Sequence, residues 1–519
     1  MKKISLILVM GVLVFASSCK KYLDINENPN SATYSTAELI LPLALTATAS
    51  NLNGFNSMGA QLGGYMANAG GYGGFGTSIT YNFSAGDFAA RWSTSYDILE
   101  DYKAILDYTE GKPEQGYYNA VARIMKAHGF QLLVDTYNDV PYTEALQGAN
   151  NLTPAYDKAE DIYKDLADEL DLAIATIHET ENATGVQELG VADVMFGGDM
   201  EKWLQFANTL KLRLIIRASH VVSFSNTTFD DAGFLTEDAT VNPGYLRDIG
   251  RQNPKWNTWG FGPSGEEGNK AWMPNTYVYG FYSGVKLSDP GRGAALYYQW
   301  PSTGTNRLGV ESNNVVSSPS GSFWLPSSNR SAATAGNASG ALKGPSADYP
   351  VITAAESYFL QAEAAVRGIV TGDAKSLFEQ GIFESFRYLY TKEDGSFVAD
   401  PVEGFEEYLV TNEASPLVNF DLAASNEQKI EAIITQKYIA LNFVNSEEGW
   451  NEYRRTGYPK VSTAAGANAQ QTFASSVSES TRADRLPGRI LYPSTEGSYN
   501  PTNVPKGVTV FGNTIFWAK

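Results

Sequence analysis

The sequence predicts an all-α protein that carries long loop-rich insertions. Apolar residues recur at spacings of three and four over two long stretches, 37–222 and 350–460, as they do in amphipathic helices. Between these stretches, residues 223–349 are rich in Gly, Ser, Asn, Pro and aromatic residues and show no sustained period. Hydrophobic residues make up 43% of the 519 positions, which is enough for a sizeable core. We therefore expect a helical scaffold that is interrupted by a layer of loops.

The first helical stretch is expected to form antiparallel hairpins, because its amphipathic segments follow one another with short connections. The hairpins that begin near Asp87 and Lys158 are offset by about 71 residues, roughly two tetratricopeptide units of 34 residues. No clean consensus recurs, so the scaffold is expected to be tetratricopeptide-like and degenerate. An irregular segment is expected at 53–82. The predicted helices cover 87–108, 114–137, 158–178 and 200–221.

The second helical stretch returns to the same period after the loop-rich insertion. The final segment, 461–519, is expected to be irregular with short extended pieces. The predicted helices cover 352–367, 373–390, 402–409, 427–445 and 448–455.

The N-terminus indicates a lipid anchor. Met-Lys-Lys precedes an apolar run of thirteen residues and then small residues, the pattern of a secretory signal peptide that is too short to span a bilayer. Cys19, the only cysteine, stands at the expected cleavage site, so we predict that it is acylated and becomes the mature N-terminus. The predicted organisation is a signal peptide at 1–18, a tether at 19–36 and a single domain at 37–519.

The charge balance argues against a nucleic-acid partner. The chain has 38 Lys and Arg against 57 Asp and Glu, a net charge of −19, whereas nucleic-acid binding needs basic residues to neutralise phosphates. Charged residues amount to only 18% of the chain, and aromatic residues reach 12%. An acidic, aromatic-rich surface with few charges favours the stacking of neutral ligands.

The aromatic residues concentrate in the loop-rich insertion, where five of the nine tryptophans lie between Tyr245 and Trp324. Sugar rings present apolar C–H faces on which a flat exposed aromatic ring can stack, and Trp and Tyr lose little rotamer entropy on binding. The alternative is that these rings fasten the loop layer onto the scaffold. The candidate ligand-binding residues are Trp256, Trp259, Trp272 and Tyr279, with Tyr72 and Tyr81 from the first irregular segment.

No motif supports catalysis, a cofactor or a metal site. Residues 71–76 match GxGxxG, but from the sequence we expect neither the preceding strand nor the following helix that a dinucleotide site requires. The three histidines are far apart and form no metal-binding spacing. Glu266 with Glu267, or Asp87, would supply carboxylates for a glycosidase, although 57 acidic residues make any pair weak evidence. We expect no catalytic residues and no cofactor.

Six segments in order resemble the SusD/RagB family of outer-membrane nutrient-binding lipoproteins, over nearly the whole mature chain. These segments are Cys19-Lys-Lys-Tyr-Leu-Asp-Ile-Asn-Glu-Asn-Pro-Asn, Asp139-Val-Pro-Tyr-Thr-Glu-Ala-Leu, Trp203-Leu-Gln-Phe-Ala-Asn-Thr-Leu-Lys-Leu-Arg-Leu, Ala355-Glu-Ser-Tyr-Phe-Leu-Gln-Ala-Glu-Ala, Gln436-Lys-Tyr-Ile-Ala-Leu through Trp450-Asn-Glu-Tyr-Arg-Arg-Thr-Gly, and Arg489-Ile-Leu-Tyr-Pro with Glu496 and Asn500.

The resemblance implies a tetratricopeptide-like helical side and a loop-rich ligand face. It also implies a location and a partner: the outer membrane, facing the cell exterior, and a TonB-dependent outer-membrane transporter of the SusC kind, to which an oligosaccharide is delivered. Binding loops vary within the family, so no ligand residue is carried over. Three alternatives stay open, namely a peptide-binding relative, a lipoprotein glycoside hydrolase, and a lid that binds ligand only together with its transporter.

Overall fold

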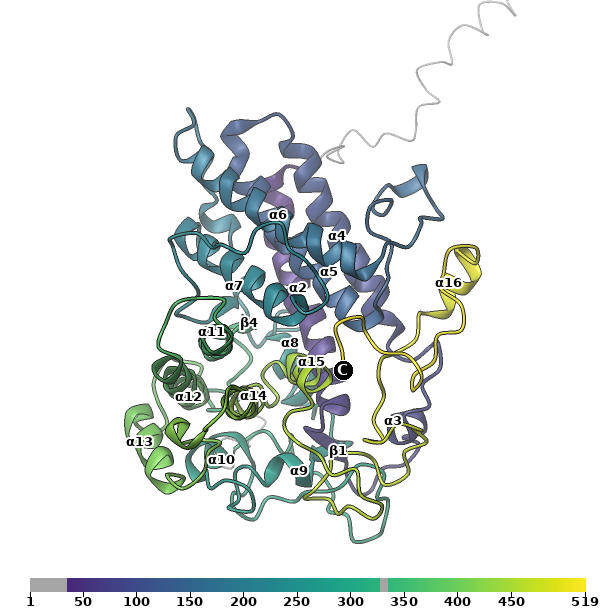
Figure 1. Ribbon diagram of the computed structural model, residues 1–519, viewed down its shortest axis with the longest axis vertical. Coiled ribbons are helices and arrows are strands. Elements are labelled where there is room, and N and C mark those ends of the chain that lie inside the picture. Colours follow the sequence, from purple (N-terminus) through teal and green to yellow (C-terminus); the bar gives the residue numbers. More distant parts are fainter. Residues whose placement is uncertain (1–34, 327–334) are drawn as a thin grey trace, which may run out of the picture.

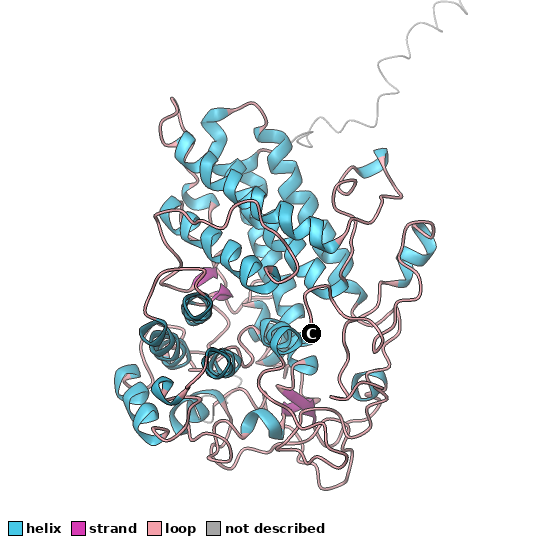
Figure 2. Ribbon diagram, viewed as in Figure 1, coloured by secondary structure: helices cyan, strands magenta, loops and turns pink. Residues whose placement is uncertain are grey.

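The computed structural model describes residues 35–326 and 335–519 and confirms the predicted all-α fold. Within these residues the only sheets are two antiparallel pairs of short strands, and long loops fill one end of the molecule (Figure 2). The predicted signal peptide, Cys19 and nearly all of the predicted tether lie outside the described residues.

The first helix group forms the upper part of the molecule in Figure 1. Its helices pack in chain order as antiparallel neighbours, α4 on α5 and α5 on α6, as predicted from the short connections. A side-chain cap fixes the start of α7, where Asp199 accepts hydrogen bonds from the backbone N–H groups of Glu201 and Lys202. The group comprises α2 (Ala37–Leu62), α4 (Ala89–Thr109), η1 (Pro113–Gln115), α5 (Gly116–Tyr137), η2 (Gly148–Asn150), α6 (Ala159–Thr180), η3 (Gly190–Ala192) and α7 (Met200–Ala218).

The second helix group packs beside the first and contains the best-formed caps. Ser425 and Gln428 make a capping box at the start of α14, and Thr353 caps α11. Helix α11 ends at Gly368, which adopts the left-handed conformation with φ +72° that favours glycine. The group comprises α11 (Ala354–Arg367), α12 (Ala374–Tyr390), α13 (Pro401–Thr411), η5 (Phe420–Leu422), α14 (Asn426–Ala440) and α15 (Ser446–Thr456).

Two predicted boundaries are wrong. Helix α2 continues to Leu62 through a segment that the sequence analysis treats as irregular, because its polar and small residues make contacts with neighbouring elements. Asn53 donates hydrogen bonds to the carbonyl of Pro254 and the hydroxyl of Thr258, and Gly59 lies against the backbone of Glu447. In the second group, α14 stops at Ala440, five residues before its predicted end.

The loop layer contains short elements that the sequence analysis does not predict. Strand β1 pairs with β3 so that Asn68 faces Trp272 and Met66 faces Pro274, and β2 pairs with β4. These elements are α3 (Thr77–Thr80), α8 (Pro254–Trp259), α9 (Thr276–Tyr279), α10 (Pro290–Leu296), α16 (Ser494–Tyr499), β1 (Met66–Asn68), β2 (Ala239–Val241), β3 (Trp272–Pro274) and β4 (Tyr349–Ile352).

Buried ion pairs connect the two helix groups. Arg217 of α7 contacts both Asp135 of α5 and Glu448 of α15. One turn earlier, Arg213 lies 2.9 Å from Glu356 of α11. All five side chains are at most 2% exposed, so water does not screen these interactions.

A second set of buried pairs extends this network through α14 and α15. Lys437 Nζ lies 2.8 Å from Glu452, and Arg455 lies 2.7 Å from Glu363 and also contacts Glu452. The acids and bases of the network come from α5, α7, α11, α14 and α15, and several belong to the segments that resemble the family. The segments that supply these residues therefore contribute to the buried core of the molecule.

Candidate ligand-binding site

Two irregular segments that are far apart in the sequence meet in the loop layer. Strands β1 and β3 bring the first irregular segment beside the loop-rich insertion. The N–H of Gly70 donates to the carbonyl of Val316 at 3.0 Å, and Asn306 donates from its N–H to Pro274 at 3.1 Å and from its side chain to Asn68 at 2.8 Å. The glycine-aromatic segment 70–76, which follows β1, is therefore hydrogen-bonded to the insertion at Gly70 and continues from there as a loop.

Two glycines of the loop at 70–76 adopt the left-handed backbone conformation, and there is open space around two of its glycines. Gly71 and Gly74 have φ angles of +82° and +78°, and no atom lies within 4 Å of the place where a Cβ would stand on Gly73 or Gly74. Tyr72 projects from this loop with 42% of its surface exposed. Of the six predicted ligand-binding residues, Tyr72 is the most exposed.

The same loop reaches Trp272. The rings of Phe75 and Trp272 meet edge to face with centroids 5.4 Å apart, and Trp272 is 7% exposed. A Cβ on Gly71 would come 3.2 Å from the hydroxyl of Ser317, so Ser317 also borders this loop. The loop that carries Tyr72 therefore contacts Trp272 through Phe75.

Trp256 and Trp259 lie under the surface. Both are 1% exposed on α8, and the ring of Trp259 packs edge to face on Phe443 at 5.1 Å. Trp324 stacks on the same Phe443 at 4.2 Å. These rings fasten the loop layer onto the helices, so the expectation that Trp256 and Trp259 present a face to a ligand is not met in this conformation.

Tyr81 is buried as well. It follows α3 in the left-handed conformation, its side chain is fully covered, and its hydroxyl accepts a hydrogen bond from the N–H of Ser475 at 3.3 Å. Burial raises the pKa of Tyr81 above its ordinary value. Tyr81 therefore packs the first irregular segment against the C-terminal segment, 461–519.

Tyr279 belongs to a second aromatic group. Its ring is half-buried on α9 and lies 5.2 Å from the ring of Trp300, and its hydroxyl donates to the carbonyl of Pro301 at 2.7 Å. Trp300 and Phe75 are the partly exposed aromatic residues that the sequence analysis does not select. Phe75 follows Tyr72 in the same glycine-rich loop, and that position is the sequence signal that would have found it.

The carboxylates considered for catalysis are engaged in local contacts. Glu267 pairs with Lys270 at 2.5 Å and accepts a hydrogen bond from the N–H of Gly321. The hydrogen bond from Lys270 lowers the pKa of Glu267. Asp87 accepts hydrogen bonds from Thr77 and Ser84 and so holds a turn. These two carboxylates are therefore occupied by contacts within the loops.

The three histidines lie in different surroundings. His128 is buried, and burial lowers its pKa to about 3, whereas His178 pairs with Asp230 at 2.7 Å and this hydrogen bond raises its pKa. His220 lies at the end of α7 beside Arg455. In the described residues, no three His, Cys, Asp or Glu side chains come together as metal ligands, and no helix there is long and apolar enough to cross a membrane.

Two sequence families match the chain over separate stretches. Residues 27–239 match a family described as starch-binding and associating with the outer membrane, and residues 326–514 match a family described as SusD and RagB outer membrane lipoprotein. Together these stretches span well over half of the chain. The chain belongs to the SusD/RagB family. The families are those of outer-membrane lipoproteins, as the N-terminal sequence and the six segments predict.

Solved SusD homologues share the fold over almost their entire length. A SusD homologue from Bacteroides fragilis is 20% identical and matches 93% of this chain and 100% of its own with a TM-score of 0.65. A homologue from Bacteroides uniformis is 25% identical, with coverages of 92% and 99% and a TM-score of 0.62. A chitin-binding SusD homologue from Flavobacterium johnsoniae is 23% identical, with coverages of 92% and 98% and a TM-score of 0.63. A search of curated proteins finds no match.

Proposed function

We propose that this SusD-like protein is a surface-exposed lipoprotein that binds oligosaccharide nutrients and delivers them to a partner TonB-dependent outer-membrane transporter. The observation that carries the proposal is the exposed Tyr72 on a glycine-rich loop whose Phe75 rests on Trp272. An exposed aromatic ring suits the stacking of a sugar ring. The match to a starch-binding family and the likeness to a chitin-binding homologue support a carbohydrate ligand.

In this proposal the loop at 70–76 supplies an aromatic ring for stacking, and the loop itself moves when ligand binds. Tyr72 stacks on one face of a sugar ring, and Ser317 donates or accepts a hydrogen bond at the rim. Displacement of Phe75 uncovers Trp272, which adds a second stacking surface. The open space around Gly73 and Gly74 lets the loop move without a steric clash. Tyr279 and Trp300 offer a further aromatic surface for a longer chain.

The proposed role is binding without turnover. Glu267 and Asp87 are held by hydrogen bonds within their own loops, which suits a structural role better than general acid catalysis. Acylation of Cys19 would keep the protein at the membrane, because two or more acyl chains bury enough CH₂ groups for stable anchoring.

The test is a calorimetric binding screen of the mature chain without its lipid. Oligosaccharides derived from starch and from chitin are compared with peptides, and each mixture is analysed for products. Binding of a saccharide that Tyr72→Ala and Trp272→Ala both weaken, with no products formed, is the expected result. Binding of peptides alone supports the peptide-binding relative, and products from a bound saccharide support a hydrolase.

The matched control is Tyr499→Ala, which removes a tyrosine that is 76% exposed on α16 and lies outside the loop at 70–76. It tests for a general effect of removing an exposed aromatic ring. Equal loss of binding in Tyr72→Ala and Tyr499→Ala would contradict the site.

A further inference from the structure

A pocket of about 90 Å³ lies between the end of α15 and the C-terminal segment. Arg454 lines it from the helix, and Arg482, Asp484, Thr514 and Lys519 line it from the segment. Figure 1 shows the end of the chain, marked C, beside α15. None of the six candidate ligand-binding residues lines this pocket, so it is separate from the proposed saccharide site.

Two guanidinium groups of the pocket meet at Gly488. Nη1 of Arg454 lies 3.4 Å from the carbonyl oxygen of Gly488. A Cβ placed on Gly488 would lie 3.5 Å from Nη1 of Arg482, and it would come within 2.5 Å of the carbonyl oxygen of Asn513. The backbone of Asn513 therefore requires glycine at this position, and two arginines from different segments lie next to the same glycine of the lining.

Arg454 keeps donor capacity that the protein does not use, although it is only 7% exposed. Its Nη2 donates to the carbonyl of Asp135 at 2.7 Å and to the side-chain oxygen of Asn451, and its Cζ lies 3.6 Å from the ring centroid of Trp450. Its Nε is buried without a hydrogen-bond partner. Among the described residues, Nη1 has only the long contact to Gly488, so Nη1 is the donor that remains for an occupant.

Positive charge exceeds negative charge in the lining. Arg482 forms an ion pair with Asp484 at 3.3 Å, and Asp484 also accepts a hydrogen bond from the N–H of Leu486 at 3.1 Å. In the part of the chain that the structure describes, neither Arg454 nor Lys519 has a carboxylate within 4.0 Å of its side-chain nitrogens. The pocket therefore holds two cations that lack an acidic partner.

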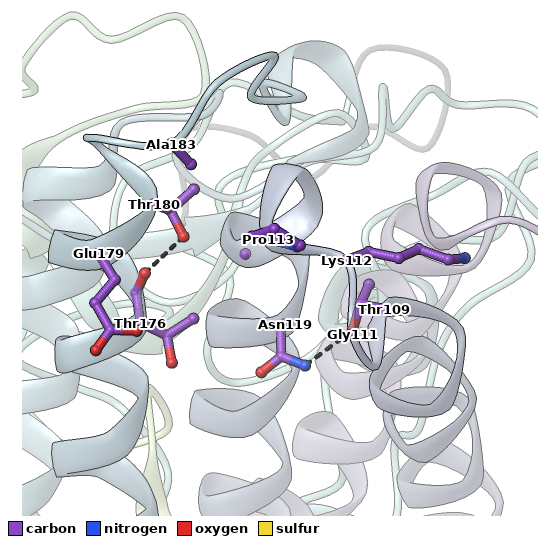
Figure 3. Close-up of a pocket in the computed structure, with 10 residues that line it drawn as sticks. Thr109, Gly111, Lys112, Pro113, Asn119, Thr176, Glu179, Thr180 and Ala183 are labelled. Atoms are coloured by element: carbon purple, nitrogen blue, oxygen red, sulfur yellow. Dashed lines mark hydrogen bonds between the residues drawn. The ribbon is translucent and has the colours of Figure 1, made fainter.

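This excess distinguishes the pocket from a larger one, of about 330 Å³, that opens at the ends of α4 and α6 and the start of α5 (Figure 3). Lys112 and Glu179 both line the larger pocket. Its charges balance, so it selects neither an anion nor a cation.

The charge of Arg454 is poorly compensated by the rest of the protein. Burial lowers the pKa of Arg454 to about 9, although Asp135 and Glu447 act in the opposite direction. The carboxylate of Asp135 is already bound by Arg217 and by the indole N–H of Trp517. An anion in the pocket would supply negative charge that the neighbouring side chains do not.

The end of α15 accounts for only part of the positive charge. Nζ of Lys519 donates to the carbonyl of Thr456, the last residue of the helix, at 3.0 Å, and Arg454 lies in the last turn. A helix C-terminus carries about half a negative elementary charge. Two unpaired cations carry two positive charges, so more than one positive charge stays uncompensated.

We infer that this pocket binds a small tetrahedral oxyanion, sulfate or phosphate. N–H donors remain on Arg454 and on the ammonium group of Lys519, and the hydroxyl of Thr514 adds a further donor. Donors on separate segments match an ion whose oxygens point in four directions, whereas a planar carboxylate is best matched by a single guanidinium. The bound ion joins α15 to the C-terminal segment.

The size of the pocket and the range of electrostatic forces are compatible with this ligand. The volume of about 90 Å³ is about three times the share of one water molecule in the liquid, which is room for a single ion of this kind. The net charge of −19 is spread over the whole chain, and at about 0.15 M salt its repulsion is screened over about 8 Å. The cations of the lining therefore dominate.

The test is a calorimetric titration of the full lipoprotein in detergent micelles. Sodium sulfate, sodium phosphate and sodium acetate are titrated separately, with sodium chloride holding the ionic strength at about 0.15 M. We expect saturable binding of sulfate or phosphate at one site and weaker binding of acetate, and the tighter of the two tetrahedral ions identifies the ligand. Acetate binding as tight as theirs, or no saturable binding of either ion, would overturn the inference.

The variants separate the pocket from diffuse charge without opening the core. Arg482→Gln and Lys519→Gln change side chains that water reaches, and each should weaken binding of the tetrahedral ion about tenfold, because it removes a charge-assisted hydrogen bond. Arg485→Gln is the matched control, since Arg485 is an exposed arginine three residues after Arg482 and outside the lining. It should bind the ion as the wild type does. Equal weakening in Arg485→Gln and Arg482→Gln would show that binding follows net charge and would overturn the inference.

Discussion

At the scale of single residues, burial separates aromatic side chains that the sequence does not distinguish. Trp256 and Tyr72 both lie in glycine-rich, low-aliphatic segments, but Trp256 is 1% exposed and Tyr72 is 42% exposed. The buried rings contribute apolar area and ring–ring contacts to the attachment of the loop layer, whereas Tyr72 makes no such contribution. The two residues are therefore expected to affect different properties.

We predict that Trp256→Ala lowers the free energy of unfolding by about 3–5 kcal/mol, since it empties a filled site beneath the loop layer. Tyr72→Ala should leave stability within about 0.5 kcal/mol, because an exposed loop side chain has few contacts to lose. It should instead weaken saccharide binding by about tenfold or more. Thermal unfolding and calorimetric titration of both variants give the comparison, and a marked loss of stability in Tyr72→Ala would show that its ring is part of the core.

Glu447 is a second residue whose burial predicts a measurable effect. Both of its carboxylate oxygens are buried without a hydrogen-bond partner. Burial, followed by the neighbouring Glu448 and Asp135, raises the pKa of Glu447 well above 4.5. In the folded chain this carboxyl therefore keeps its proton at pH values where the unfolded chain has lost it.

We predict that Glu447→Gln becomes progressively more stable than the wild type as the pH rises. A raised carboxyl pKa favours folding only below the unfolded value, so the wild type loses about 1.4 kcal/mol per pH unit between 4.5 and the folded pKa. Glutamine has no proton to lose and is free of this penalty. Scanning calorimetry of both proteins at pH 5 and pH 8 measures the trend, and a difference in Tm that does not grow with pH would contradict it.

At the scale of the element, the loop at 70–76 offers a matched pair of glycines. Neither Gly73 nor Gly74 has an atom within 4 Å of a Cβ position, but only Gly74 has a positive φ, +78°. An alanine at Gly74 is strained by roughly 1–2 kcal/mol in that conformation, and an alanine at Gly73 is not. A comparison of the alanine variants at these two positions separates the effect of backbone conformation from the effect of the added methyl group.

We predict that Gly74→Ala weakens saccharide binding by roughly five- to tenfold because it shifts Tyr72 and Phe75 from their positions. Gly73→Ala should bind as the wild type does. Gly73→Ala should unfold at the wild-type temperature, whereas the backbone strain should lower the unfolding temperature of Gly74→Ala slightly. Calorimetric titration with the saccharide identified in the screen is the measurement, and equal binding by the two variants would show that this backbone conformation is not needed.

The helices were predictable from sequence because local signals agree with the apolar period. Asp199, Thr353 and Ser425 stand at N-caps just before amphipathic runs, and the predicted starts of α7, α11 and α14 lie within two residues of the observed ones. The second half of α2 was missed because its asparagines and glycines form tertiary contacts, as Asn53 and Gly59 do. Nothing local in the sequence distinguishes such residues from loop residues.

The candidate site was predictable only in part. Composition selects the aromatic residues of the loops, but a segment without a period gives no indication of which side chains face the helices. Trp259 packs on Phe443, which follows it by 184 positions, and Tyr81 contacts Ser475 from the C-terminal segment. Burial of this kind depends on long-range contacts.

At the scale of the whole molecule, the segments that resemble the family account for how the two helix groups hold together. Arg213 stands in one such segment, Glu356 in another and Glu452 in a third, and all three belong to the buried ion network. Buried pairs of this kind restrict how helices associate, because a misplaced partner leaves a charge unpaired in the interior. The scaffold can then remain constant while the loops that carry Tyr72 and Trp272 differ.

The network predicts how the stability of the whole molecule depends on pH. Burial raises the pKa of Glu452, but Arg455 and Lys437 outweigh burial and bring it down to about 2. A depressed carboxyl pKa stabilises the fold above the unfolded value of 4.5, and this contribution is lost as the pH falls toward 2. Glu452→Gln should lower the free energy of unfolding by about 3–5 kcal/mol at pH 7, because it leaves buried cations without their partner.

The difference in Tm between the wild type and Glu452→Gln should therefore be largest above pH 5 and should shrink as the pH falls from 4.5 to 3. Glu403→Gln is the control, since Glu403 is an exposed acid in the first turn of α13 with no ion pair among the described residues. It should follow the wild type at every pH. A Tm difference for Glu452→Gln that stays constant between pH 7 and pH 3 would mean that the charge of Glu452 contributes nothing to the buried ion network, and that its effect on stability comes from packing alone.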